Sequence, residues 1–83
     1  MDAGSLTMYT TTWCGYCIRL KRLLDRDGVA FLEVDIEDDP IGADFVTSVN
    51  GGSQTVPTLR FADGSTLTNP TMDQVRQRLS RAS

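Results

Sequence analysis

Short strand-like stretches alternate with helical patterns along the chain. Leu6–Thr10 mixes apolar and β-branched residues, which predicts a first strand. From Cys14 to about Asp27, leucines recur at helical spacing, and neither Pro nor Gly interrupts the segment after Gly15. Gly28 follows directly, as is common after the C-terminus of a helix. The first third of the chain therefore predicts a strand followed by a helix.

The middle of the chain repeats this order. Phe31–Ile36 alternates strictly, and this period of two predicts a strand with Leu32, Val34 and Ile36 on one face. Asp39 and Pro40 fit the N-cap and the first position of a second helix. The apolar stripe of that helix, which stops at the glycine pair 51–52, consists of Ile41, Phe45, Val46 and Val49.

The last third predicts a hairpin and a third helix. Thr58–Phe61 and Ser65–Leu67 flank Asp63-Gly64, a dipeptide typical of tight hairpin turns. Asn69-Pro70 predicts the start of the last helix. The residues that this helix turns inward are expected to be Met72, Val75 and Leu79.

The predicted order is β-α-β-α-β-β-α, an α/β chain. A β-α-β unit requires a right-handed crossover between parallel strands, whereas the hairpin adds antiparallel strands. We therefore expect a single domain over residues 1–83. It is built as a four-stranded mixed sheet with three helices placed on both of its faces.

Composition narrows the possible partners. The chain has 83 residues, no histidine and a formal net charge of −3. An acidic balance argues against nucleic acid, because phosphates are neutralised by Lys and Arg. No apolar run approaches the roughly 20 residues of a membrane span, and the first residues lack the basic and apolar regions of a secretory signal. We expect a cytoplasmic monomer with neither nucleic acid nor membrane as a partner.

Cys14 and Cys17 lie at the junction of the first strand and the first helix. Free backbone N–H groups and the helix dipole favour a thiolate at a helix N-terminus. We therefore expect Cys14, at the tip, to be the nucleophile and Cys17, one turn further along, to be the resolving thiol. A C-x-x-C pair within a β-α-β unit is typical of a thioredoxin-like redox motif.

The same cysteine spacing also occurs in zinc sites. Zinc needs four ligands, and this chain has no third cysteine and no histidine, so only a site shared between two chains remains open. The acidic run over residues 33–39 is interpreted as solvated charge and helix capping. We expect neither a metal nor a bound organic cofactor.

Thr55-Val56-Pro57 directly precedes the third predicted strand. Most X-Pro bonds are trans, and the residues alone leave both isomers open. A cis bond would turn the Val56 backbone toward Cys14, where a peptide or a small thiol could pair with it strand to strand. We predict the cis form.

Together, these features resemble the glutaredoxin family of the thioredoxin superfamily across essentially the whole chain. The matching stretches are Tyr9-Thr10, Trp13-Cys14-Gly15-Tyr16-Cys17, Gly51-Gly52, Thr55-Val56-Pro57-Thr58 and Phe61-Ala62-Asp63-Gly64. Within the family, the W-C-G-Y-C, V-N-G-G and D-G-S-T-L-T-N-P segments are most similar to those of the mycoredoxins. The resemblance implies a thioredoxin-like fold.

The resemblance also implies a thiol–disulfide oxidoreductase that reduces mycothiol mixed disulfides on proteins or small molecules. Cys14 would attack the mycothiolated substrate, a second mycothiol would release the mixed disulfide, and Cys17 would be dispensable on this route. The implied thiol-binding residues are Trp13, Tyr16, Thr55, Val56 and Pro57. From the residue types alone, Trp13 and Tyr16 could form either an exposed lip against the substrate or half-buried packing under the loop.

Two departures from the family pattern favour mycothiol over glutathione as the co-substrate. Gly15 replaces the proline usual between the cysteines of glutathione-using members, and Thr68-Asn69-Pro70 replaces their Gly-Gly-x-Asp stretch. One alternative is a dithiol redoxin that a flavoprotein, thioredoxin reductase, reduces directly and that serves ribonucleotide reductase. Another is an iron–sulfur carrier in which two chains each lend Cys14.

Overall fold

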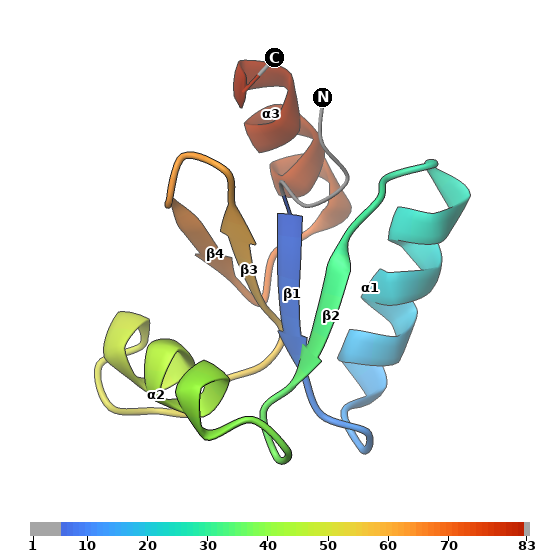
Figure 1. Cartoon of the computed structure of the whole chain (residues 1–83). Coiled ribbons are helices and arrows are strands. Elements are labelled where there is room, and N and C mark those ends of the chain that lie inside the picture. The colour runs from blue at the N-terminus through green and yellow to red at the C-terminus, as the bar shows by residue number, and fades with distance from the viewer. Residues whose placement is uncertain (1–5, 83) are drawn as a thin grey trace.

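The computed structural model describes residues 6–82, and its elements follow the predicted order (Figure 1). The expected domain, 1–83, extends beyond the described residues at both ends. The elements are β1 (Leu6–Thr10), α1 (Gly15–Arg26), β2 (Leu32–Asp35), α2 (Pro40–Val49), β3 (Thr58–Phe61), β4 (Thr66–Thr68) and α3 (Met72–Ala82). None of the helices within 6–82 has the length and apolar character needed to cross a membrane.

The four strands form one mixed sheet in the order β2-β1-β3-β4. β1 pairs in parallel with β2, whereas the β1–β3 and β3–β4 pairs are antiparallel. Tyr9 lies opposite Val34 on one side and Thr58 on the other. As a result, the carboxyl end of β1 and the amino end of β3 lie side by side at the same end of the sheet.

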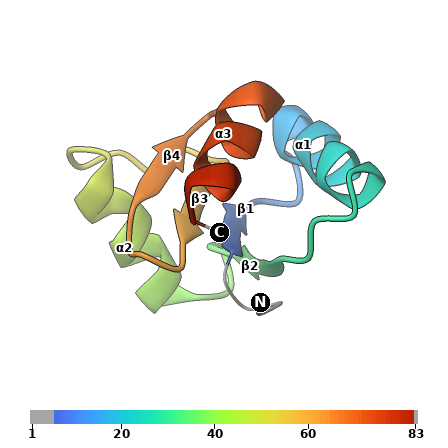
Figure 2. The same cartoon turned by 90° about the horizontal axis from the view of Figure 1, so that it is seen from above.

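Helices cover both faces of this sheet, as predicted (Figure 2). α1 and α3 pack on one face and α2 on the other. The core under α1 and α3 consists of Leu6, Met8, Cys17, Leu20, Leu24, Leu59, Phe61, Met72 and Val75. The smaller core under α2 consists of Tyr9, Ile36 and Val46. The alternation of Met8 and Tyr9 between the two cores follows from the strand period of two.

α1 ends as the sequence predicts. Gly28 adopts a positive φ of 72°, and its N–H donates to the Asp25 carbonyl at 3.1 Å. The Val29 N–H donates to the Leu24 carbonyl at 2.9 Å. These two bonds form a Schellman motif, in which glycine relieves the cost of a left-handed backbone.

The apolar stripe predicted for α2 is only partly buried. Gly42 and Val46 form the buried row, whereas Ile41 is 82% exposed and Val49 is also exposed. The helix turns the 42–46 row to the sheet because Gly42 permits a close approach. A Cβ at Gly42 would lie 3.0 Å from Cγ1 of Val34.

β2 is shorter than the predicted strand 31–36, and its face is not uniformly buried. Ile36 is buried and Val34 half-buried against the α2 core, but Leu32 is 56% exposed. β2 is an edge strand, and α2 covers only the end of it that lies next to Ile36. Leu32 shares a face with Val34 and Ile36, as the alternation predicted, but it lies at the exposed end of that face.

The hairpin loop consists of residues 62–64, the three positions that lie between the two predicted strands. Phe61 accepts from the Gly64 N–H at 2.9 Å and donates its own N–H to the Ser65 carbonyl at 2.9 Å. The loop therefore has three residues, with Gly64 at a φ of 87°. This arrangement moves β4 to Thr66–Thr68 from the predicted 65–67.

The last helix begins later than predicted. Asn69 adopts a φ of 52° and Pro70 lies before the helix, which starts at Met72. The Thr71 hydroxyl accepts the Gln74 N–H at 3.2 Å, and the Gln74 side-chain carbonyl accepts the Thr71 N–H at 2.8 Å. This reciprocal pair is a capping box, so Thr71 is the N-cap of α3.

Because the capping box sets the start of α3, Thr71→Ala is expected to lower the free energy of unfolding by about 1 kcal/mol. Thr71→Ser keeps the accepting oxygen and is expected to retain most of that stability. Urea denaturation of the three proteins measures the difference. If the helix instead began at Asn69, Thr71 would be an interior position, and alanine there would be neutral or stabilising.

Candidate active site

Cys14 is the N-cap of α1. Its backbone is extended, with φ −82° and ψ 110°, and its sulfur accepts the Cys17 N–H at 3.1 Å. The side chain is partly exposed and lies where the loop from β1 enters the helix. A sulfur in this position accepts from an N–H group that the helix itself leaves unpaired.

Cys17 lies one turn further along α1 and is 1% exposed. Burial, and after it the hydrogen bond with Cys14, raises the pKa of its thiol from the ordinary value of 9.0 to about 11. Hydrogen bonds with Thr10 and Thr11 act in the opposite direction. Cys17 is therefore a protonated thiol at neutral pH. Both cysteines are free thiols in this structure.

The Val56–Pro57 bond is cis, which confirms the isomer predicted from the sequence. It stands opposite Cys14, whose sulfur lies 3.9 Å from the Val56 carbonyl oxygen. Pro57 is buried, and its carbonyl accepts the Asn69 N–H at 2.8 Å. The structure thus brings the Cys14 and Cys17 pair close to Val56 and Pro57, which lie about forty positions further along the sequence.

The Val56 N–H is an unpaired backbone donor in this loop. Within residues 6–82, no group accepts it, and Val56 itself is only half-buried. The Thr55 carbonyl, in the same peptide unit as the Val56 N–H, accepts the Thr58 hydroxyl at 2.8 Å. An unpaired backbone donor beside a reactive sulfur suits a ligand that carries a carbonyl near its own sulfur.

The two aromatic residues beside the cysteines differ in their environment. Trp13 is 71% exposed, and its indole N–H donates to Oε2 of Glu37 at 2.8 Å. Tyr16 is half-buried, and its hydroxyl donates to the Pro70 carbonyl at 2.6 Å. Trp13 therefore fits the exposed lip considered from the sequence, whereas Tyr16 fits the packing alternative and ties α1 to the loop before α3.

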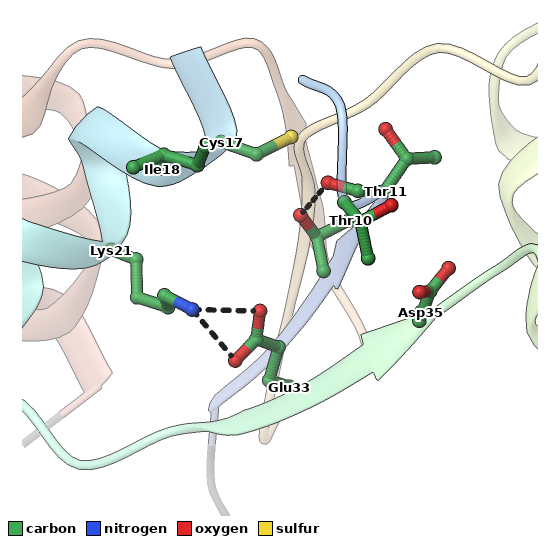
Figure 3. Close-up of a pocket in the computed structure, with 8 residues that line it drawn as sticks. Thr10, Thr11, Cys17, Ile18, Lys21, Glu33 and Asp35 are labelled. Carbon is green, nitrogen blue, oxygen red and sulfur yellow. Dashed lines mark hydrogen bonds and ion pairs between the residues drawn. The ribbon is translucent and has the colours of Figure 1, made fainter. Parts of the chain in front are cut away.

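A pocket of about 420 Å³ opens on the side of α1 that faces β2 (Figure 3). The Cys17 sulfur points toward the Thr10–Thr11 segment there, and the Lys21 ammonium is 3.2 Å from the Glu33 carboxylate. The residues that line it are Thr10, Thr11, Thr12, Cys17, Ile18, Lys21, Glu33 and Asp35. This pocket was not predicted from the sequence. The signal for it was the i, i+4 spacing of Cys17 and Lys21 on one helix face.

Side chains of the acidic run over residues 33–39 accept hydrogen bonds from backbone N–H groups close to them in the sequence. Asp39 caps α2 by accepting the N–H groups of Ile41 and Gly42, both at 3.1 Å. Asp35 accepts the Glu37 N–H at 2.9 Å. Within residues 6–82, no group of three or more His, Cys, Asp or Glu side chains is arranged to hold a metal ion.

Comparison with known proteins agrees with this geometry. The glutaredoxin family model matches residues 6–65. A Mycobacterium tuberculosis (strain H37Rv) protein that carries a glutaredoxin name is 58% identical over 79 residues, covering 95% of this chain and 94% of that protein. Mycoredoxin 1 of Corynebacterium glutamicum is 39% identical over 72 residues, covering 87% of this chain and 89% of its own.

The fold is also similar to that of a solved glutaredoxin structure. The crystal structure of the glutaredoxin from Methanosarcina mazei Go1 aligns with a TM-score of 0.80 at 25% identity, over 95% of this chain and 81% of that one. The thioredoxin-like fold implied by the sequence is therefore confirmed.

The contrast between the cysteines predicts selective alkylation. At pH 6 to 7, iodoacetamide is expected to label Cys14 and leave Cys17 unlabelled, because Cys17 is buried and its pKa lies near 11. Peptide mapping by mass spectrometry locates the label. In a Cys14→Ser variant, Cys17 is expected to react only in denaturant or at strongly alkaline pH. Preferential labelling of Cys17 in the native protein would overturn the assignment.

Proposed function

Since the chain belongs to the glutaredoxin family, whose members are thiol–disulfide oxidoreductases, we propose that it reduces mixed disulfides between mycothiol and proteins or small molecules. Cys14 is the nucleophile in this proposal. Cys17 is the resolving thiol only on a competing route, which closes a disulfide between the two cysteines. The reaction takes place in the cytoplasm, and the protein acts as a monomer.

The proposal rests on one observation above the others. The Cys14 sulfur combines a helix-start N–H at 3.1 Å with partial exposure, and it faces a backbone loop whose Val56 N–H has no partner within 6–82. The choice of mycothiol is supported by the similarity to mycoredoxin 1, which extends over 87% of the chain. The thiol lies along Val56 and Pro57, flanked by Thr55, Trp13 and Tyr16.

In the first step, the Cys14 thiolate attacks the mycothiol sulfur of the substrate disulfide. The substrate disulfide breaks, a new disulfide joins Cys14 to mycothiol, and the substrate thiolate leaves and takes a proton from water. The Cys17 N–H, 3.1 Å from the Cys14 sulfur, supports the attacking thiolate in this step.

In the second step, the thiolate of another mycothiol attacks the mycothiol sulfur held on Cys14. The Cys14 thiolate leaves, and the disulfide of mycothiol is released. Each turnover therefore consumes one mycothiol thiol from solution, and the other half of the released disulfide is the mycothiol that the substrate carried. A flavoprotein disulfide reductase that returns this disulfide to the thiol completes the cycle.

Cys17 offers a competing second step, in which its thiolate attacks the Cys14 sulfur of the mixed disulfide. The bond to mycothiol breaks, mycothiol leaves as a thiolate, and a Cys14–Cys17 disulfide closes within the chain. This step first requires the loss of the Cys17 proton. The pKa of about 11, raised chiefly by burial, opposes that loss at neutral pH. Direct reduction by thioredoxin reductase would pass through this internal disulfide, so the buried thiol favours the mycothiol route.

The two routes make opposite demands on Cys17. With mycothiol as the reductant, Cys17→Ser is expected to keep most of the activity toward a mycothiolated peptide, because a thiol from solution resolves the intermediate. Cys14→Ser is expected to be inactive, because the chain has no histidine to activate a serine. Steady-state assays that supply mycothiol, glutathione or thioredoxin reductase separately measure both variants.

A loss of more than about 100-fold in the Cys17→Ser variant, about 2.7 kcal/mol of transition-state stabilisation, would contradict the mycothiol route. Activity of the unaltered protein with thioredoxin reductase alone would identify the dithiol alternative. Faster turnover with glutathione than with mycothiol would refute the choice of co-substrate while leaving the role of Cys14 intact.

A further inference from the structure

Three hydrogen bonds run in sequence behind the loop that faces Cys14. The Thr68 hydroxyl donates to Oδ1 of Asn50 at 2.6 Å, and the Asn50 amide donates to Oγ1 of Thr58 at 3.2 Å. The Thr58 hydroxyl then donates to the Thr55 carbonyl at 2.8 Å. The chain of bonds links the ends of α2, β3 and β4 to the residue before Val56.

The direction of this chain is fixed at Asn50. Its amide nitrogen also donates to the Val46 carbonyl at 2.9 Å, and a carbonyl can only accept. The amide therefore cannot turn over without losing that bond and placing its oxygen against the Val46 carbonyl oxygen. Because Asn50 donates to the Thr58 oxygen, the one hydroxyl proton of Thr58 remains for Thr55. Thr58 is 0% exposed, so no water competes at its side chain.

Fixing the Thr55 carbonyl also fixes the Val56 N–H. The two groups belong to one peptide unit, which is trans, so they point in opposite directions across a plane that rotates only as a whole. The Thr58 hydroxyl holds the carbonyl on the sheet side. The Val56 N–H is thereby turned away from Thr58, and no group within 6–82 accepts it.

We propose that Thr68, Asn50 and Thr58 form a positioning relay that aims the Val56 N–H at the substrate, and that this relay sets a preference for thiols with an amide or acyl carbonyl near the sulfur. The three residues act through Val56 and do not touch the substrate. This inference rests on the proposed function, because it assumes that Cys14 attacks a disulfide beside Val56.

The test compares two symmetrical disulfides, so that attack on either sulfur gives the same product. One is the disulfide of N-acetylcysteine methylamide, which carries carbonyls near its sulfurs, and the other is bis(2-hydroxyethyl) disulfide, which carries none. Each is mixed with the pre-reduced protein, and the rate of mixed-disulfide formation on Cys14 is followed by mass spectrometry in a single turnover. No external thiol or reductase enters this measurement.

Thr58→Val is expected to slow the reaction with the acylated disulfide at least 10-fold and to change the reaction with bis(2-hydroxyethyl) disulfide less than twofold. Thr58→Ser restores the hydroxyl and is expected to restore the preference. Thr47→Val is the matched control, because the Thr47 hydroxyl donates within α2, to the Ala43 carbonyl at 2.8 Å, away from the relay. Its ratio of the two rates should equal that of the unaltered protein.

Thr68→Val provides a second test at an exposed position, where loss of the fold is not expected. It removes the first bond of the relay and should lower the same ratio about threefold. A Thr58→Val or Thr68→Val protein that is folded by circular dichroism and keeps the ratio of the unaltered protein would overturn the proposal, as would equal slowing with both disulfides.

The outcome also separates this inference from the proposed function. An unaltered protein that reacts with neither disulfide would refute the role of Cys14 itself. An unaltered protein that reacts with both at equal rates would refute the relay alone, because an aimed Val56 N–H should favour the acylated disulfide.

Discussion

The antiparallel pairing of β1 with β3 is the constraint on which the site depends. β1 lies in the middle of the sheet, with Leu6 and Met8 fully buried, so its register cannot shift without moving apolar side chains to the opposite face. The register places Tyr9 opposite Thr58. The chain therefore leaves β1 toward Cys14 at the same end of the sheet where it enters β3 from Val56. This places the Cys14 sulfur 3.9 Å from the Val56 carbonyl oxygen.

Hydrogen bonds to the loop between β4 and α3 hold the two halves of the site together. The Tyr16 hydroxyl ties the first turn of α1 to the Pro70 carbonyl, and the Asn69 N–H ties the same loop to Pro57. This three-way contact explains the positive φ of Asn69, which turns its N–H back toward Pro57. The segment predicted as the start of the last helix is instead a brace for the site, and the helix begins only after it.

The sequence was sufficient where a single local rule decides the structure. The period of two over Phe31–Ile36, the glycine after α1 and the Asp39-Pro40 start of α2 each led to a correct element, because each depends on neighbours in the chain. The cysteine pair was located for the same reason. Its position between a strand and a helix is visible in the order of the residues.

Features that depend on distant partners were not visible in this way. Ile41 belongs to the apolar stripe of α2, but the close approach at Gly42 turns a different row toward Val34. The hydrogen bonds of Asn50 and Thr68 behind the loop could not be predicted, because they form only when the ends of α2 and β4 meet beside Thr58. The pocket beside Cys17 likewise requires α1 and β2 to be placed together.

The central claim is that a thiol held on Cys14 pairs with the Val56 backbone. Amide hydrogen exchange, measured by NMR on the Cys17→Ser variant with mycothiol disulfide-bonded to Cys14, tests this claim most directly. The account predicts at least 10-fold slower exchange of the Val56 N–H than in the reduced variant, and no such slowing when methanethiol replaces mycothiol. Unchanged exchange at Val56, with protection at Lys21 and Glu33 instead, would contradict the account and place the thiol in the pocket beside Cys17.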